Sequence, residues 1–322
     1  MNNLLVVPSP DTQDANVSIA DWAELSALFA ADGSTSREDV VRALRRDGTS
    51  PLVSEETAQD VFKELADRAS CAITSGGAMT YPFTLERNNT YLRLNNFGPN
   101  DRWRRGFVYN FLLLVTRASM SSKERVLAGV DPTKIFENLC AAVLQTFWGG
   151  ASSHSGAMVF GTSAPSASSF KSKVEDLCTK LGEGGGWREG AVVPGGGDGK
   201  LDLVAWRKFQ DGRQGGLVGF AQCKTGVNWD QHLTKLRPLT FCRKFMKLPL
   251  VLEPVRIYMV PNRIGRHVWE EHTGNAGILF DRCRIVQYAD GIDKKLLVQA
   301  QKWLDEAVEQ QKTIMKRVSR RP

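Results

Sequence analysis

The sequence predicts an α/β fold in which a helical N-terminal module precedes a mixed domain of helices and strands. Helical patterns dominate residues 1–126, with one hairpin among them, and the other strand patterns appear later in the chain. Residues 127–322 follow the order helix, three-stranded antiparallel hairpin sheet, helix, strand. Apolar residues make up 42% of the chain and charged residues 24%, which are the proportions of a globular protein. We therefore expect two parts, 1–126 and 127–322.

The N-terminal module is predicted to contain three helices and a hairpin after a loose polar leader, residues 1–18. The expected helices are 21–31, 36–46 and 54–68, and a hairpin over 81–94 turns at Asn88-Asn89. Three helices followed by a hairpin resemble a winged helix. The third helix, however, exposes acidic residues, the wrong charge for reading a DNA groove: Glu55, Glu56, Asp60, Glu64 and Asp67. A partner-binding or autoinhibitory role is favoured over DNA reading.

The elements that follow the hairpin are helical. A helix over 101–118 starts basic and becomes apolar. Asp131-Pro132 predicts the start of another helix, because an N-cap acceptor precedes proline at the first helical position. This helix is expected to end near Phe147. A Ser/Ala/Gly-rich loop, 151–169, and a short helix, 170–181, follow.

The strand patterns place three polar residues in or beside apolar strands. The expected strands are 187–193, 201–206 and 217–224, with a closing strand over 255–260 after a helix at 228–247. Gln222 and Lys224 are two residues apart in one strand, so their side chains point to the same face of the sheet. Asp202 lies in an apolar strand, where a carboxylate is costly unless it is paired or binds a cation. A basic helix over 293–318 ends the chain.

The glycine-rich turn and the two central strands carry a resemblance to a known family. The segment Gly-Gly-Gly-Asp-Gly-Lys-Leu-Asp-Leu-Val-Ala-Trp, followed by Gly-Phe-Ala-Gln-Cys-Lys-Thr-Gly, resembles the PD-(D/E)xK nuclease superfamily. In particular it is similar to Mrr-like restriction endonucleases and related anti-phage effectors. The resemblance covers residues 131–260 and implies a restriction-endonuclease-like core. Phe136-Glu137-Asn138-Leu139 matches a pattern that often contributes a further glutamate in this family.

The resemblance implies a metal-dependent nuclease with Mg²⁺ or Mn²⁺ as its cofactor. Hard cations prefer oxygen ligands, here the side chains of Asp202, Gln222 and Glu137 and the backbone carbonyl of Cys223. Such ions stabilise charge on the reacting phosphate and lower the pKa of the attacking water. Lys224 would orient that water or stabilise developing negative charge. Gln222 departs from the commoner acid and is a weaker ligand.

Several alternatives stay open. Glu175 is the reserve for Glu137, and Asp198 could assist a metal but is favoured as a residue that holds the glycine turn. A nucleophilic role for the Cys223 thiol is disfavoured, because its position points it to the opposite face of the strand. The sequence contains neither a zinc-type ligand spacing nor the Lys-Ser/Thr pair of a P-loop. The rival function is a nuclease fold that binds nucleic acid or a partner without cutting.

The charge distribution and the cysteines limit the partners and the cellular compartment that we expect. Residues 1–100 carry 8 Lys and Arg against 14 Asp and Glu, whereas the rest carry 34 against 21. The later part of the chain therefore favours polyanions, and we expect nucleic acid, with DNA preferred, to bind there. Six scattered cysteines and the lack of a membrane-length apolar run predict a cytoplasmic protein that binds no membrane. By analogy, the N-terminal module would receive a protein partner of a prokaryotic anti-phage defence system.

Overall fold

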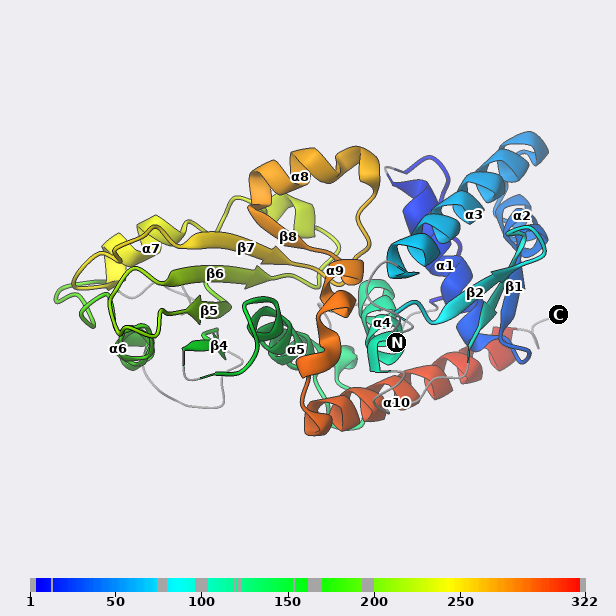
Figure 1. Cartoon of the computed structure of the whole chain (residues 1–322). Coiled ribbons are helices and arrows are strands. Elements are labelled where there is room, and N and C mark those ends of the chain that lie inside the picture. The colour runs from blue at the N-terminus through cyan, green and yellow to red at the C-terminus, as the bar shows by residue number, and fades with distance from the viewer. Residues whose placement is uncertain are drawn as a thin grey trace.

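The computed structural model describes residues 4–12, 14–73, 80–95, 104–118, 120, 123–152, 154–161, 170–192 and 200–318. Within these ranges the chain forms a mixed α/β structure with a three-stranded antiparallel sheet and a five-stranded mixed sheet (Figure 1). The two sheets lie at opposite ends of the molecule, and α4 (Arg104–Arg117) lies between them (Figure 1).

The N-terminal part combines three helices with the smaller sheet. Its elements are α1 (Ala15–Phe29), β1 (Ser34–Ser36), α2 (Arg37–Arg46), α3 (Pro51–Ile73), β2 (Phe83–Glu86) and β3 (Tyr91–Leu94). The strands are ordered β1-β3-β2. Ser36 caps α2 as predicted, in a capping box with Asp39. The hairpin also turns where predicted, since Asn88 and Asn89 both adopt positive φ, which asparagine tolerates.

Three expectations for this part were wrong. The leader is not loose over its described residues, because Leu4 is buried and α1 begins at Ala15, six residues before the expected start. No strand was expected between the first two helices, but Ser34 opens β1, which pairs with β3. The third helix begins at Pro51, where proline fits a first helical position, and not at Ser54.

The five-stranded sheet has the order β4-β5-β6-β7-β8 and carries helices on both faces. Its elements and their neighbours are α5 (Pro132–Phe147), β4 (Ser155–Val159), α6 (Phe170–Leu181), β5 (Leu203–Arg207), β6 (Leu217–Cys223), η2 (Trp229–His232), α7 (Pro238–Phe245), β7 (Val255–Met259), α8 (Trp269–Ala276), β8 (Ile278–Phe280), α9 (Arg282–Gln287) and α10 (Lys294–Val318). The first three strands are antiparallel, whereas β7 and β8 run parallel to β6. Asp131 caps α5 through the backbone N–H of Thr133, as predicted.

The first strand of this sheet lies where the sequence predicted a loop. β4 occupies 155–159, within the expected loop 151–169, of which residues 162–169 lie outside the described part. Its small residues are required by packing, since a side chain on Gly156 would lie 2.5 Å from the Trp206 ring. The strand expected at 187–193 is wrong: within its described residues, only Trp187 forms a bridge, to Met246. The helix expected at 228–247 is also wrong, because Pro238 starts a new helix, α7, after η2.

Apolar packing joins the elements into layers. α5 covers one face of the sheet through a large cluster that includes Phe136, Leu203 and Ala221. α6 and α7 cover the other face, where Phe220 packs with Phe170, Phe241 and other aromatic residues. The large cluster also contains residues of α1 and α3, so it continues across the predicted boundary at residue 126. α10 runs from beneath α5 and α9, past α4, to the N-terminal part (Figure 1). Over the described ranges, every helix is too short or too polar to traverse a bilayer.

Candidate active site at the edge of the five-stranded sheet

Strand register brings three of the predicted site residues to one edge of the sheet. Leu203 of β5 pairs with Ala221 of β6, so Asp202 and Gln222 are neighbours across two antiparallel strands. Lys224 follows directly after β6. Its Nζ atom lies 3.7 Å from Oδ2 of Asp202. The structure thus brings together the acid, the amide and the lysine that the sequence singled out.

Backbone contacts from both neighbouring strands hold Asp202 in place. Its carbonyl accepts hydrogen bonds from the N–H groups of Phe160 (2.7 Å) and Gly161 (3.0 Å), just past β4. Its own N–H donates to the Ala221 carbonyl at 3.0 Å. The carboxylate is buried and its Oδ2 accepts the Cys223 N–H at 2.8 Å. A fixed backbone and a backbone donor therefore orient this carboxylate toward the end of β6.

Gln222 is a buried amide whose polar atoms are unsatisfied. Its side chain is 1% exposed, and neither Oε1 nor Nε2 has a hydrogen-bond partner within the described part of the chain. A buried polar group in this state costs about 1–3 kcal/mol, which a fold rarely retains without a use for the group. Its register partner Tyr258 does not satisfy it, because the Tyr258 hydroxyl donates instead to the Trp229 carbonyl at 2.7 Å. The amide oxygen is therefore available to bind a cation that prefers oxygen ligands.

The open side of this edge is basic. Lys224 is 30% exposed, so its ammonium group reaches both Asp202 and solvent. His232 of η2 lies in the field of three lysines: burial and the positive charges of Lys235, Lys224 and Lys200 lower its pKa. A cluster of positive charge beside one buried carboxylate favours binding of an anion.

The thiol of Cys223 points away from this open side, as the strand alternation predicted. Cys223 packs in the large cluster with α5, and burial, then its hydrogen bond with Cys140, raises the pKa of its thiol far above the ordinary range. A thiol that stays protonated is a poor nucleophile. The negative charges of Asp202 and Glu137 raise the same pKa further, and Glu137 belongs to α5, which covers the face of the sheet that this thiol occupies.

The remaining candidates are not part of this group. Glu175 lies on the exposed face of α6 with its carboxylate 3.9 Å from Nζ of Lys171. Asp198 lies outside the described residues. No three His, Cys, Asp or Glu side chains come together as a metal group over the ranges the structure describes. Asp202 and Gln222 nevertheless suit a hard cation, because they offer a carboxylate and an unsatisfied amide oxygen. Glu137 is placed only relative to the Cys223 thiol, whose pKa its charge helps to raise.

Sequence reasoning missed two residues that border the site. Tyr258 is fully buried beside Gln222, and the negative charge of Asp202 contributes, after burial, to raising its pKa. His232 was expected within a long helix, and it lies instead in η2. The pairing of β7 with β6 could have indicated Tyr258, since parallel neighbours end at the same edge of a sheet. No sequence signal identified His232.

Comparison of the chain with protein-family models, with curated proteins and with solved structures found no match.

Proposed function

We propose that this protein is a metal-dependent nuclease of the PD-(D/E)xK type that hydrolyses phosphodiester bonds, with DNA the preferred substrate. The observation that carries the proposal is the meeting of Asp202, Gln222 and Lys224 at one sheet edge, with an unsatisfied amide beside a buried carboxylate. The element order supports it: α5, then the antiparallel strands β4, β5 and β6, then α7 and β7, with α6 inserted after β4 and the short η2 after β6.

The residues of the site would bind the metal ion, stabilise negative charge on the phosphate and position the attacking water. Asp202, Gln222 and Glu137 would hold Mg²⁺ or Mn²⁺, together with the backbone carbonyl of Cys223. When bound, such an ion supplies charge stabilisation to the phosphate and acidifies water. Lys224, held near Asp202 but reaching solvent, would position the attacking water or stabilise the charge on the phosphate oxygens. The surrounding lysines would attract the polyanionic backbone.

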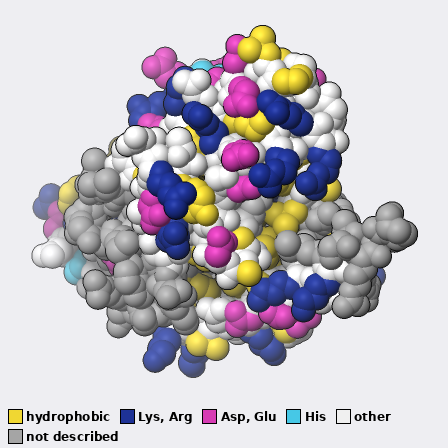
Figure 2. Space-filling model, turned by 90° about the vertical axis from the view of Figure 1, so that its right-hand side faces the viewer, with side chains coloured by type: hydrophobic (Ala, Val, Ile, Leu, Met, Phe, Trp, Pro, Cys, Tyr) yellow, Lys and Arg dark blue, Asp and Glu magenta, His cyan; other side chains and the backbone are white. Residues whose placement is uncertain are grey.

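The N-terminal part is better suited to a partner or a regulatory role than to groove reading. Its helices and hairpin have the order of a winged helix, but the exposed half of α3 carries Glu55 and Glu56. Arg45 of α2 is tied to Glu55 at 3.1 Å. Figure 2 shows this end of the molecule, where basic and acidic side chains are interspersed without a single-sign field. We extend the proposal, by analogy alone, to an effector of an anti-phage defence system whose partner binds here.

A second candidate is a nuclease fold that binds nucleic acid without cutting it. It is favoured by the amide at Gln222, where the superfamily more often has an acid, and by the lack of a three-acid group among the residues described. A neutral amide is a weaker ligand for a hard cation than a carboxylate. The two candidates differ in one observable, which is cleavage.

Plasmid cleavage in the presence of Mg²⁺, Mn²⁺ or EDTA tests the proposal. We expect nicking or cutting with either metal and none in EDTA. Asp202→Asn should lower the rate by about 10²–10³-fold or more, because it removes the charged ligand. Asp211→Asn removes an equal charge from the exposed β5–β6 turn and should cleave like the wild type. Equal loss in both variants, or activity that persists in EDTA, would refute the metal mechanism; binding without cleavage would favour the second candidate.

A further inference from the structure

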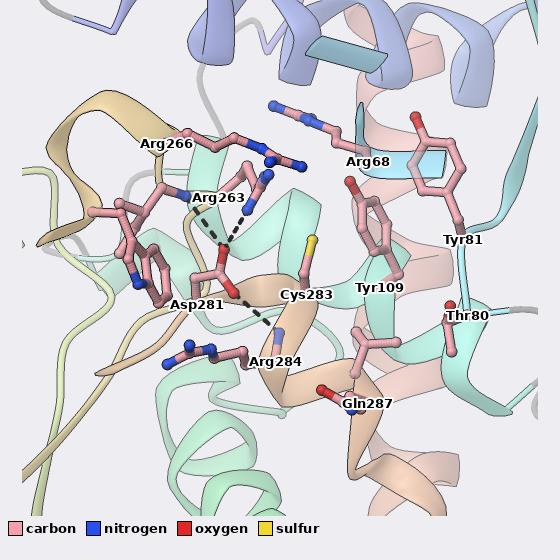
Figure 3. A pocket seen from close by; sticks show the side chains of 13 residues that line it. Arg68, Thr80, Tyr81, Tyr109, Arg263, Arg266, Asp281, Cys283, Arg284 and Gln287 are labelled. Carbon is pink, nitrogen blue, oxygen red and sulfur yellow. Dashed lines mark hydrogen bonds and ion pairs between the residues drawn. The ribbon is translucent and has the colours of Figure 1, made fainter. Parts of the chain in front are cut away.

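Helix α3 is tied to the loop that follows β7 by a group of carboxylate–guanidinium pairs. Arg263 donates to Glu64 Oε1 (3.3 Å), to Asp67 Oδ2 (2.9 Å) and to Asp281 Oδ2 (3.0 Å). Arg266 meets Asp67 through two nitrogens, with Nε 3.1 Å from Oδ2. Figure 3 shows the two arginines entering from the same loop, with Asp281 below them and Arg68 of α3 beyond. Glu64 and Asp67 were expected to lie exposed, and they meet these two arginines instead.

The loop 261–268 lies at the edge of the sheet that carries the candidate site. β7 runs parallel to β6, and Met259 pairs with Cys223, so the loop leaves the sheet beside Lys224. Both strands point toward the N-terminal part (Figure 1). Ile264 and Val268 of the loop pack in one small cluster with Tyr258, which borders Gln222. A shift of the loop would therefore change the packing around Tyr258, which borders the site.

The two arginines differ in how firmly they are held. Arg263 is 7% exposed and forms ion pairs with three acids. Arg266 is 73% exposed and forms an ion pair with Asp67, whose side chain is 22% exposed. A half-exposed pair is weak and is screened by salt, so a competing anion can displace one partner. The guanidinium fork that holds a carboxylate through two nitrogens binds a phosphate in the same manner.

Space for such a competitor exists beside the contact. A cavity of about 350 Å³ lies between α3 and α9, and its lining includes Arg263, Arg266 and Arg284. A wider groove of about 690 Å³ also reaches Arg266, but acidic side chains line it and disfavour an anion: Asp14, Asp60, Glu64 and Asp67. A phosphate of the nucleic-acid backbone could thus approach Arg266 from the cavity.

We propose that Arg266, with Arg263 behind it, is a phosphate-binding position for the nucleic-acid backbone, and that Asp67 of α3 occupies it in the substrate-free protein. The acidic helix then acts as an internal competitor that raises the substrate concentration needed for binding. The identity of the competitor as nucleic acid rests on the proposed function. The position of the loop beside the site makes displacement of Asp67 part of substrate engagement.

Fluorescence anisotropy measures the binding of a short labelled DNA duplex in EDTA. Because EDTA prevents metal-dependent cleavage, this measurement separates the contact from catalysis. Asp67→Asn should bind the duplex about 3–10-fold more tightly than the wild type, since it removes the competing charge. Glu56→Gln is the matched control, because it removes one charge from the exposed half of the same helix. Arg266→Ala should weaken binding and lower the salt dependence by about one phosphate contact.

The outcomes decide the proposal without reference to cleavage. Tighter binding by Asp67→Asn than by Glu56→Gln, together with weaker binding by Arg266→Ala, supports it. Equal effects of the two acid variants would mean that only net charge matters, and unchanged binding by Arg266→Ala would remove the phosphate position; either result overturns it. A wild type that binds the duplex but never cuts it would refute the nuclease function alone. Thermal melting of each variant verifies that the fold is retained.

Discussion

Replacement of Gln222 by methionine should stabilise the metal-free protein while it abolishes cleavage. The side chain is 1% exposed, and both amide atoms lack hydrogen-bond partners in the described structure. Methionine has a similar length and needs no such partners. Removing the unsatisfied amide should therefore gain about 1–3 kcal/mol in the free energy of unfolding. At about 2–4 °C per kcal/mol for a large domain, the melting temperature should rise by roughly 2–12 °C.

Gln311 supplies a matched control for this substitution. It is also a fully buried glutamine, but its Oε1 accepts the Leu4 N–H at 3.1 Å. Gln311→Met would leave that N–H unsatisfied, so the protein should lose about 1–3 kcal/mol of stability. Thermal and urea denaturation in EDTA measure both variants. A Gln222→Met protein that is less stable than the wild type would refute the reasoning, because the amide would then be a structural group and not one kept for a ligand.

Three further predictions concern the buried charged groups of α1, α3 and α9. Arg282 donates to both carboxylate oxygens of Asp21 at 2.8 Å, so Arg282→Met should cost about 3–5 kcal/mol by leaving that carboxylate undercompensated. The same change at the exposed Arg46 of α2 should cost less than about 0.5 kcal/mol, and urea titrations measure both variants. Burial raises the pKa of Asp21, but the charges of Arg282 and Arg68 outweigh burial and hold the pKa well below its usual value. Its contribution should be present above the unfolded pKa, about 3.9, and be lost as pH falls below it; stability that stays constant between roughly pH 5 and pH 2 would contradict this. Burial raises the pKa of Glu24 instead, outweighing Arg68, so the folded state binds the extra proton and stability should decline as pH rises above the ordinary glutamate pKa of about 4.3.

The parts of the fold that the sequence predicted are those with local chemical signals. The caps at Ser36 and Asp131 and the turn at Asn88-Asn89 all lie where expected, because each satisfies backbone groups or backbone angles within a few residues. β4 was missed for the opposite reason. Its sequence, Ser-Gly-Ala-Met-Val, has little intrinsic strand preference, and small residues are needed there by the facing Trp206 ring.

Grouping of the site was predictable only where it depends on strand register. Asp202, Gln222 and Lys224 meet because a hairpin joins their strands, and the hairpin is visible in the sequence. The contacts of Glu64 and Asp67 with Arg263 and Arg266 join residues almost two hundred positions apart, with no local signal. The acidic residues of α3 are visible in the sequence, but only the tertiary structure identified the arginines that Asp67 meets.

Location of bound Mn²⁺ by anomalous scattering from crystals of the wild-type protein tests the central claim most directly. The proposed function predicts a peak between the Asp202 carboxylate and the Gln222 amide oxygen, with Lys224 beside it. Crystals of the Asp202→Asn variant, soaked with Mn²⁺ in the same way, should lack that peak. A wild type that cuts DNA with Mn²⁺ but shows its peak elsewhere, or keeps it in Asp202→Asn, would contradict the assignment of this sheet edge as the active site.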